Sequence, residues 1–315
     1  MTVNLQAIRE AAERIRPYIH RTPVITCHSL DDRVKAQVFL KCENLQKVGA
    51  FKFRGASNAV FSLTNEEASK GVVTHSSGNH AQAIALAARI RGIPAYIVMP
   101  SNSPAVKKAA VTGYGGKITL CEPTLEARES TLERIRLETE ATVIHPYNNE
   151  RVIAGQGTAA LELLEEIPDL DSIIAPVGGG GLLSGTALAA KGVSARIRVI
   201  GAEPEMADDA SRSMQAGKIL PSVRPKTVAD GLLTSLGTLT FPIIRQYVEQ
   251  IVTVSEAGII EAMRFVWERA KLVIEPSSAV AVGVLWERKI DLSGLKVGVI
   301  LSGGNVDLGN LPWRE

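Results

Sequence analysis

The sequence predicts an α/β protein in which helices cover parallel strands. Short apolar runs end in turn residues and lead into helical patterns along almost the whole chain. The predicted strands of this alternation are GVVTHS (71–76), AYIVMP (95–100), KITLCE (117–122), TVIHPY (142–147), SIIAPVG (172–178), RVIGAEP (198–204), QIVTVS (250–255) and KVGVILSGG (296–304). Apolar runs of this length are typical of strands buried on both faces of a parallel sheet.

Two further elements come before this alternation. Residues 1–20 predict an amphipathic helix, and QVFLKCE (37–43) predicts a first strand. The most loop-like segment is PSVRPKTVADG (221–231). The first helix lacks the long apolar stretch of a signal peptide, and no later apolar run reaches membrane-spanning length. We therefore expect a soluble, cytoplasmic protein without membrane contact.

Composition excludes several classes of protein. The chain has 315 residues, more than one compact core usually holds, so two domains are expected. Its 35 Lys and Arg and 33 Asp and Glu residues leave a net charge of +2 and are interspersed, so no nucleic-acid partner is indicated. Cys27, Cys42 and Cys121 lie far apart without metal-ligand spacing, so we expect reduced, structural thiols.

Three polar, glycine-rich segments follow predicted strands. They are SSGNHAQA (76–83), GGGGLLSG (178–185) and SGGN (302–305). In open α/β sheets, ligands bind beyond the carboxyl ends of the strands. The three segments therefore predict one shared ligand site, in which Ser302 would present its hydroxyl to a ring atom of the ligand.

The glycines of GGGGLLSG precede the first turn of a predicted helix. Unpaired N–H groups and the helix dipole attract anions there, so the segment predicts a phosphate cradle. The alternative is a tight strand-to-helix turn without a ligand. The spacing fits neither the dinucleotide motif nor the nucleoside-triphosphate motif.

Lys52 lies between Phe51 and Phe53 in GAFKFRGA (49–56). Apolar surroundings disfavour the ammonium form, lower the pKa of the lysine and make it competent to form a Schiff base. The alternative is an ordinary lysine that reaches solvent past two core aromatic residues. Taken alone, the flanking residues favour that alternative.

Two other polar segments leave alternatives open. The helix start in SSGNHAQA offers donors for a carboxylate, or a simple N-cap. His80 in this segment is expected to pack within its helix, since no second histidine stands at metal-ligand spacing. EPEMADD (203–209) gathers four carboxylates that a hard cation would bind, although a solvated acidic loop is favoured from these residues alone.

Together these segments resemble the fold-type II pyridoxal-phosphate enzymes, in the branch of serine/threonine dehydratases, serine racemases and 3-hydroxyaspartate dehydratases. The resemblance covers nearly the whole chain, and its specificity comes from the order of the motifs. They are RTPV, GAFKFRGA, SSGNHAQA, AGQGTAALE, GGGGLLSG, EPEMADD, ADG, IEPSSAVA and SGGNVD. The resemblance implies a fold like the tryptophan synthase β subunit, with two open, mostly parallel sheets flanked by helices. It also implies a large domain of residues 1–70 and 148–315 and a small mobile domain of residues 71–147.

The resemblance further implies the cofactor site. Lys52 would bind pyridoxal 5'-phosphate as a Schiff base, with Phe51 beside the ring. Asn79 would contact the ring hydroxyl and Ser302 the pyridine nitrogen. The phosphate would be bound by Gly178, Gly179, Gly180, Gly181 and Leu182. A neutral serine at that nitrogen makes the ring a weaker electron sink than a carboxylate would, which favours elimination and racemisation over transamination.

By the same resemblance, Lys52 and Ser77 are the catalytic residues. Lys52 would remove the α-proton, and Ser77 would face it across the cofactor. The α-carboxylate of the substrate would be held by Ser76, Ser77, Asn79 and His80. Arg128 would meet a second carboxylate, which favours 3-hydroxyaspartate, whereas the alternative is a solvent-facing arginine in a charged helix. Glu203, Asp209 and the backbone carbonyl of Ala207 would bind Mg²⁺, Ca²⁺ or Mn²⁺.

The expected activity is the removal of water from 3-hydroxyaspartate, serine or threonine, giving a 2-oxoacid and ammonia. The alternative is a serine racemase with dehydratase side activity. A β-replacement synthase is disfavoured because its lysine is usually followed by Asp-Arg, whereas Lys52 is followed by Phe53 and Arg54. A non-catalytic module that binds a phosphate ligand through GGGG would leave the other motifs unexplained. Such relatives are commonly homodimers, so a homodimer is expected.

Overall fold

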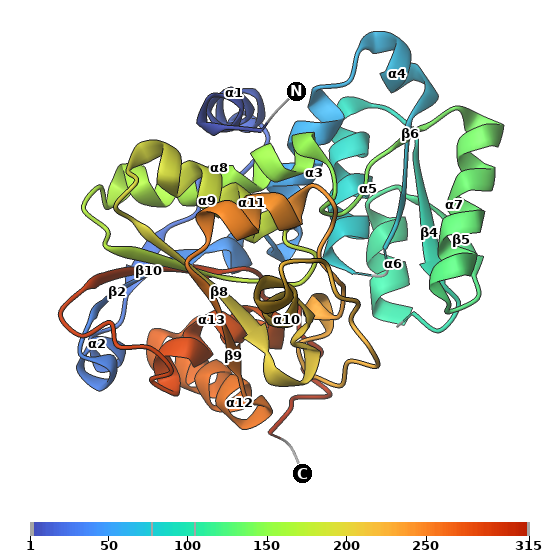
Figure 1. Ribbon diagram of the computed structural model, residues 1–315. Coiled ribbons are helices and arrows are strands. Elements are labelled where there is room, and N and C mark those ends of the chain that lie inside the picture. The colour runs from blue at the N-terminus through green and yellow to red at the C-terminus, as the bar shows by residue number, and fades with distance from the viewer. Residues whose placement is uncertain (1–2, 77, 104, 314–315) are drawn as a thin grey trace.

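The computed structural model describes residues 3–76, 78–103 and 105–313 of the chain. Its elements are arranged around two sheets (Figure 1). The strands are β1 (Val24–Thr26), β2 (Gln37–Cys42), β3 (Val72–His75), β4 (Ala95–Pro100), β5 (Lys117–Cys121), β6 (Thr142–Val143), β7 (Ser172–Pro176), β8 (Arg198–Pro204), β9 (Gln250–Val254) and β10 (Lys296–Leu301). The α-helices are α1 (Leu5–Ile15), α2 (His28–Val34), α3 (Lys52–Phe61), α4 (Asn65–Lys70), α5 (Asn79–Arg91), α6 (Ala105–Gly113), α7 (Leu125–Thr139), α8 (Glu150–Glu166), α9 (Gly181–Val193), α10 (Asp209–Ala216), α11 (Thr240–Tyr247), α12 (Glu256–Phe265) and α13 (Pro276–Trp286).

The larger sheet has the strand order β1-β2-β10-β7-β8-β9, and the smaller sheet has the order β5-β4-β3-β6. Neighbouring strands are parallel except for β1, which pairs antiparallel with β2. The predicted architecture of two open, mostly parallel sheets is confirmed. The sequence did not predict β1, because three residues are too few to show a strand period.

Helices cover both faces of the larger sheet, which explains why its central strands are apolar along their length. Helices α8 and α9 pack with α1 and α11 on one face, and α2, α12 and α13 cover the other (Figure 1). All residues of β7 are buried, and five of the six residues of β10 are buried. Because helices cover both faces, polar loops gather at the carboxyl ends of the strands.

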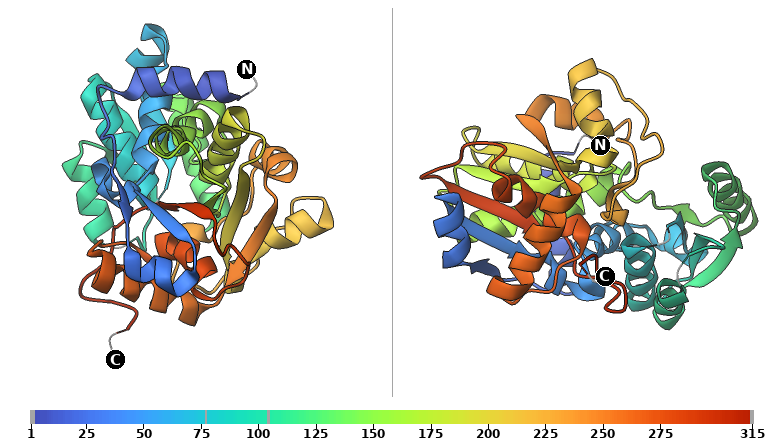
Figure 2. Two further views of the ribbon diagram at one scale, coloured as in Figure 1. Left: turned by 90° about the vertical axis from the view of Figure 1, so that its left-hand side faces the viewer. Right: turned by 90° about the horizontal axis from the view of Figure 1, so that it is seen from below.

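The smaller sheet has α5 and α6 on one face and α7 on the other. This sheet and its helices project to one side of the larger sheet (Figure 2, right). Helix α3 packs against both α5 and α8, so it lies between the helical layers of the two sheets. Lys52 is the first residue of α3. The lysine is therefore placed where the two halves of the structure meet.

Glycines bring α3, α8 and α9 into backbone contact. A Cβ added to Gly155 of α8 would lie 2.6 Å from the Cα of Gly55 in α3. A Cβ added to Gly185 of α9 would lie 2.5 Å from the backbone N of Gly157 in α8. Real Cβ atoms do not approach other atoms so closely, so these positions require glycine. The motif AGQGTAALE thus fixes how α3 and α9 are spaced across α8.

The N-terminal helix forms as predicted, and it is amphipathic. The side chain of Asn4 accepts a hydrogen bond from the backbone N–H of Ala7 at 2.9 Å, which satisfies one unpaired donor at the helix start. Ile8, Ala11 and Ile15 are buried on one side of this helix. Among the described residues, no helix has both the length and the apolar character needed to cross a membrane.

Candidate active site

Segments after strands of both sheets meet around the start of α3. The backbone N–H of Phe51 donates to the carbonyl of Ser302 at 2.9 Å, and the N–H of Gly304 donates to the carbonyl of Gly49 at 2.9 Å. Asn305 Nδ2 donates to Asn79 Oδ1 at 2.9 Å. The segment around Lys52 therefore lies between the loop after β10 and the start of α5.

The amine of Lys52 is held in a half-buried position. Its Nζ donates to the backbone carbonyl of Pro146 at 3.0 Å and lies 5.1 Å from the centre of the Phe51 ring. Burial lowers the pKa of Lys52 from 10.5 to about 8, although the charge of Glu275 acts in the opposite direction. Near neutral pH, Lys52 thus supplies far more free amine than an exposed lysine does, as a nucleophile or base requires.

The glycine-rich segment presents a row of free backbone donors. In the described part of the chain, the backbone N–H groups of residues 178–182 donate no hydrogen bond to another protein group. A Cβ on Gly179 would lie 2.3 Å from the Tyr147 ring, and Gly180 has a positive φ of 88°. The glycines are therefore needed for close protein contacts as well as for an anion. Free N–H groups at the start of α9 fit a phosphate group.

Asn79 is oriented by two residues that were not among the predicted site residues. Its Nδ2 donates to Glu275 Oε1 at 3.0 Å and Oε2 at 3.2 Å, while its Oδ1 accepts from Asn305. Glu275 is 6% exposed, and burial raises its pKa to about 7, with the hydrogen bond from Asn79 opposing this shift. The sequence signal that could have identified Glu275 is its position directly before the apolar helix in IEPSSAVA. Ser302 is buried at the end of β10.

The predicted binding site for the α-carboxylate lies at the start of α5. His80 is 2% exposed, its Nε2 lies 3.2 Å from the carbonyl of Ile144, and its Nδ1 has no partner among the described residues. Burial and the charge of Lys52 hold the pKa of His80 well below its ordinary value, so the ring is neutral. Ser76 Oγ accepts from the N–H of Gly78 at 3.3 Å. Ser77, the other predicted catalytic residue, lies outside the described residues.

A cavity of about 320 Å³ opens between the smaller sheet and α7. It is lined by His75, Glu129, Leu132, Glu133, Val143 and His145. The rings of His75 and His145 lie edge to face, with centroids 5.9 Å apart. Arg128 in α7 is half-buried, and its Nε is buried without a partner in the described part of the chain. Burial lowers the pKa of His75, and the charge of Arg128 lowers it further. Arg128 therefore faces the His75 side of α7.

Two buried carboxylates form the predicted cation site. Glu203 and Asp209 are each 1% exposed. Glu203 accepts from the N–H groups of Ala210 and Ser211 at 2.8 Å, whereas neither oxygen of Asp209 makes a hydrogen bond of ordinary geometry to a described residue. Burial raises the pKa of Glu203 to about 8 and of Asp209 to about 6. A buried carboxylate with unpaired oxygens, such as Asp209, fits a hard cation. Ala207, whose carbonyl completes the predicted set, is buried beside them.

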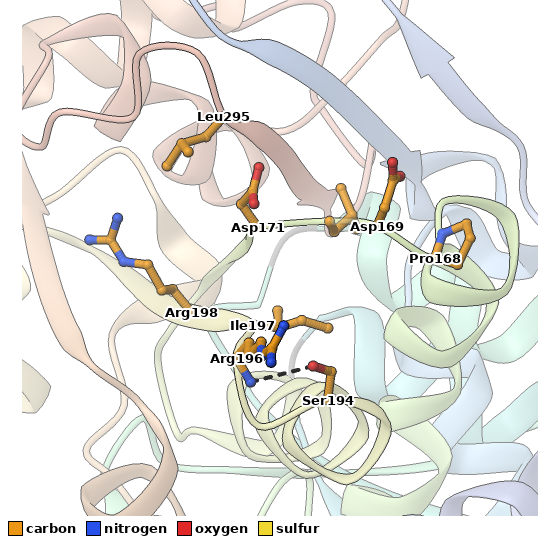
Figure 3. A pocket seen from close by; sticks show the side chains of 9 residues that line it. Pro168, Asp169, Asp171, Ser194, Arg196, Ile197, Arg198 and Leu295 are labelled. Atoms are coloured by element: carbon orange, nitrogen blue, oxygen red, sulfur yellow. Dashed lines mark hydrogen bonds between the residues drawn. The ribbon is translucent and has the colours of Figure 1, made fainter.

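A second cavity has a volume of about 430 Å³ (Figure 3). It is lined by Pro168, Asp169, Leu170, Asp171, Ser194, Arg196, Ile197, Arg198 and Leu295. These residues surround the amino ends of β7, β8 and β10. Ligands of open α/β sheets bind at the opposite, carboxyl ends of the strands. This second cavity therefore lies at the edge of the sheet opposite the polar segments around Lys52.

Known proteins resemble the chain over almost its full length. The family model described as pyridoxal-phosphate dependent enzyme matches residues 15–303. A serine racemase of Oryza sativa subsp. indica is 51% identical over 99% of this chain and 93% of its own length. A β-hydroxyaspartate dehydratase of Paracoccus denitrificans is 51% identical over 96% of each chain. The crystal structure of serine racemase from Dictyostelium discoideum superposes with a TM-score of 0.95 at 51% identity, covering 98% of this chain and 100% of that one. A lysine with a lowered pKa and a row of free backbone donors agree with these matches, and the chain belongs to the family of pyridoxal-phosphate-dependent enzymes.

Proposed function

We propose that this enzyme eliminates water from a β-hydroxy amino acid to give an enamine. The enamine becomes an imine, which takes up water and hydrolyses to a 2-oxoacid and ammonia. The observation that carries the proposal is the half-buried amine of Lys52, whose lowered pKa makes it a base at the meeting point of both sheets. The relatives named as β-hydroxyaspartate dehydratase and serine racemase support the same class of substrate.

The residues of the chain have different roles in this reaction. Pyridoxal phosphate, when bound, acts as an electron sink that acidifies the α-carbon of an attached amino acid. The free N–H groups of residues 178–182 would bind its phosphate, and Phe51, Asn79 and Ser302 would orient its ring. Lys52 takes the α-proton, and the carbonyl of Pro146 holds the amine in place when it is free. Ser76, Ser77, Asn79 and His80 would hold the α-carboxylate of the substrate.

We propose 3-hydroxyaspartate as the preferred substrate, because the unpaired Nε of Arg128 offers a charged donor for a second carboxylate. The test is release of 2-oxoacid by the purified protein, supplied with pyridoxal phosphate and Mg²⁺, from separate stereoisomers of 3-hydroxyaspartate, serine and threonine. A higher kcat/KM for a hydroxyaspartate isomer supports the proposal. Equal or higher values for serine or threonine would make the protein a general dehydratase. Lys52→Ala should release no 2-oxoacid from any of them.

The second candidate is a serine racemase that also dehydrates, which the 51% identity to serine racemases favours. In that case Ser77 would deliver a proton to the face of the α-carbon opposite Lys52. Formation of D-serine from L-serine, measured on a chiral column, tests this candidate. Ser77→Ala should abolish racemisation and leave dehydration by Lys52 in place.

We further propose that Glu203, Asp209 and the carbonyl of Ala207 bind Mg²⁺, Ca²⁺ or Mn²⁺, since the unpaired oxygens of Asp209 support a cation there.

We also propose a homodimer in the cytoplasm, which sedimentation analysis and cell fractionation would test. The smaller sheet, within residues 71–147, would form a small domain that closes over substrate. Unchanged energy transfer between labelled domains on addition of a substrate analogue would refute closure.

A further inference from the structure

Arg54, two residues after Lys52, belongs to a network of four buried charges. Arg54, Lys41 and Glu43 are fully buried, and Glu162 is 9% exposed. Arg54 donates to Glu43 from Nε at 2.6 Å and from Nη2 at 2.9 Å. It donates to Glu162 from Nη1 and from Nη2, each at 2.8 Å. Lys41 Nζ donates to Glu162 at 2.7 Å. Two cations and two carboxylates therefore pair with one another in the protein interior.

This network joins segments that are far apart in the sequence. Glu43 follows β2, Glu162 belongs to α8, and Arg54 belongs to α3. Arg54 Nη1 also donates to the hydroxyl of Thr158 at 3.2 Å, and Nη2 lies 3.4 Å from the hydroxyl of Thr22. The guanidinium thus fixes α3 against the end of β2, the segment before β1, and α8.

These contacts add to the backbone hydrogen bond from Phe51 to Ser302 in holding the start of α3. Phe51, at the N-cap position, makes no side-chain hydrogen bond to the helix, but Gln156 Oε1 of α8 accepts from the N–H of Gly55 at 3.2 Å. Lys52 and Arg54 share the first turn and are about 200° apart around the helix axis. Their side chains therefore leave the helix on opposite sides. Arg54 enters the buried network while Lys52 reaches the carbonyl of Pro146.

We propose that Arg54 is a positioning residue that fixes Lys52 for catalysis, with Glu43 and Glu162 holding its guanidinium. This inference rests on the proposed function, in which Lys52 is the base. Stability alone does not call for such a network, because apolar residues of similar volume often stabilise a core as well as buried ion pairs do. A planar fork bonded to two carboxylates on different elements, by contrast, allows one placement of the first turn of α3.

The first test is Arg54→Lys, which keeps the charge but cannot bridge both carboxylates. Displacement of a reacting group by about 1 Å lowers a rate about 100-fold, so kcat should fall by this order while KM changes little. The pH midpoint for capture of pyridoxal phosphate by Lys52, followed by visible absorbance, should also shift. A matched control is Leu30→Ala, which leaves a cavity in the buried core at α2 away from the network. It should lower the melting temperature and leave kcat and the pH midpoint unchanged.

The second test is the double variant Arg54→Met with Glu43→Leu. It removes one cation and one carboxylate and leaves the pair of Lys41 and Glu162 intact. We expect a melting temperature near that of the wild type together with the loss of kcat seen for Arg54→Lys. Wild-type kcat and pH midpoint in either variant would overturn the positioning role. If the wild-type protein captures no pyridoxal phosphate, it is the proposed function that fails, and the two failures are thereby distinguished.

Discussion

The pKa of Lys52 gives a quantitative prediction for cofactor capture. Burial lowers this pKa from 10.5 to about 8. A difference of about 2.5 units means that, well below pH 8, Lys52 supplies about 300-fold more neutral amine than an ordinary lysine. The rate at which cofactor-free protein captures pyridoxal phosphate should therefore rise about tenfold per pH unit below pH 8 and level off above it.

The assay is the growth of visible absorbance after pyridoxal phosphate is mixed with cofactor-free protein, at closely spaced pH values from 6 to about 10.5. Lys52→Ala gives the background from the other lysines. Glu275→Gln sharpens the test, because the charge of Glu275 raises the pKa of Lys52. The variant should move the midpoint below that of the wild type. A wild-type midpoint near 10.5, or an upward shift in Glu275→Gln, would refute the buried environment that we assign to the amine.

Three further variants test the rest of the site. Arg128→Ala should lower kcat/KM for 3-hydroxyaspartate about tenfold to 100-fold, because a charged hydrogen bond to the substrate is lost. The kcat/KM for serine should stay unchanged. An equal loss for both substrates would contradict this. Gly179→Ala should place a Cβ 2.3 Å from the Tyr147 ring, destabilise the protein by about 1–3 kcal/mol and weaken cofactor binding measured by fluorescence. Gly113→Ala, with open space at its Cβ, is the control. Mg²⁺ at 100 times its Kd should stabilise the wild type by about 3 kcal/mol in thermal unfolding, and Asp209→Asn should remove this gain.

The alternation of strands and helices could be predicted because it is local. Three strands of the smaller sheet and the central strands of the larger sheet each show an apolar run that ends in turn residues. The fourth, β6, covers only Thr142–Val143 of the predicted range 142–147. β1 could not be predicted, since three residues paired antiparallel with β2 carry no period of their own. The sequence predicted only one of the two reasons for the glycines after β7. Their N–H groups could be assigned to an anion, but the contact of Gly179 with Tyr147 depends on the fold.

The parts of the site that escaped prediction depend on contacts between distant segments. The carbonyl of Pro146 has no sequence signature, and it binds Lys52 only because α8 and α3 are neighbours. Glu275 lies far along the chain from Asn79, so their hydrogen bond could not be read from spacing. The network of Arg54 with Glu162 is hidden for the same reason.

The backbone contact between Gly55 and Gly155 has a consequence for how the chain folds. Everything from β3 to β6 lies between these two glycines in the sequence, so their contact closes a long loop. Closure of a flexible loop of this length is entropically unfavourable and slows folding. The closure becomes easier when the four parallel strands of the smaller sheet are already assembled, because a compact insert holds its own ends near each other. We therefore expect the smaller sheet to gain protection from hydrogen exchange before α3 docks on α8 during refolding.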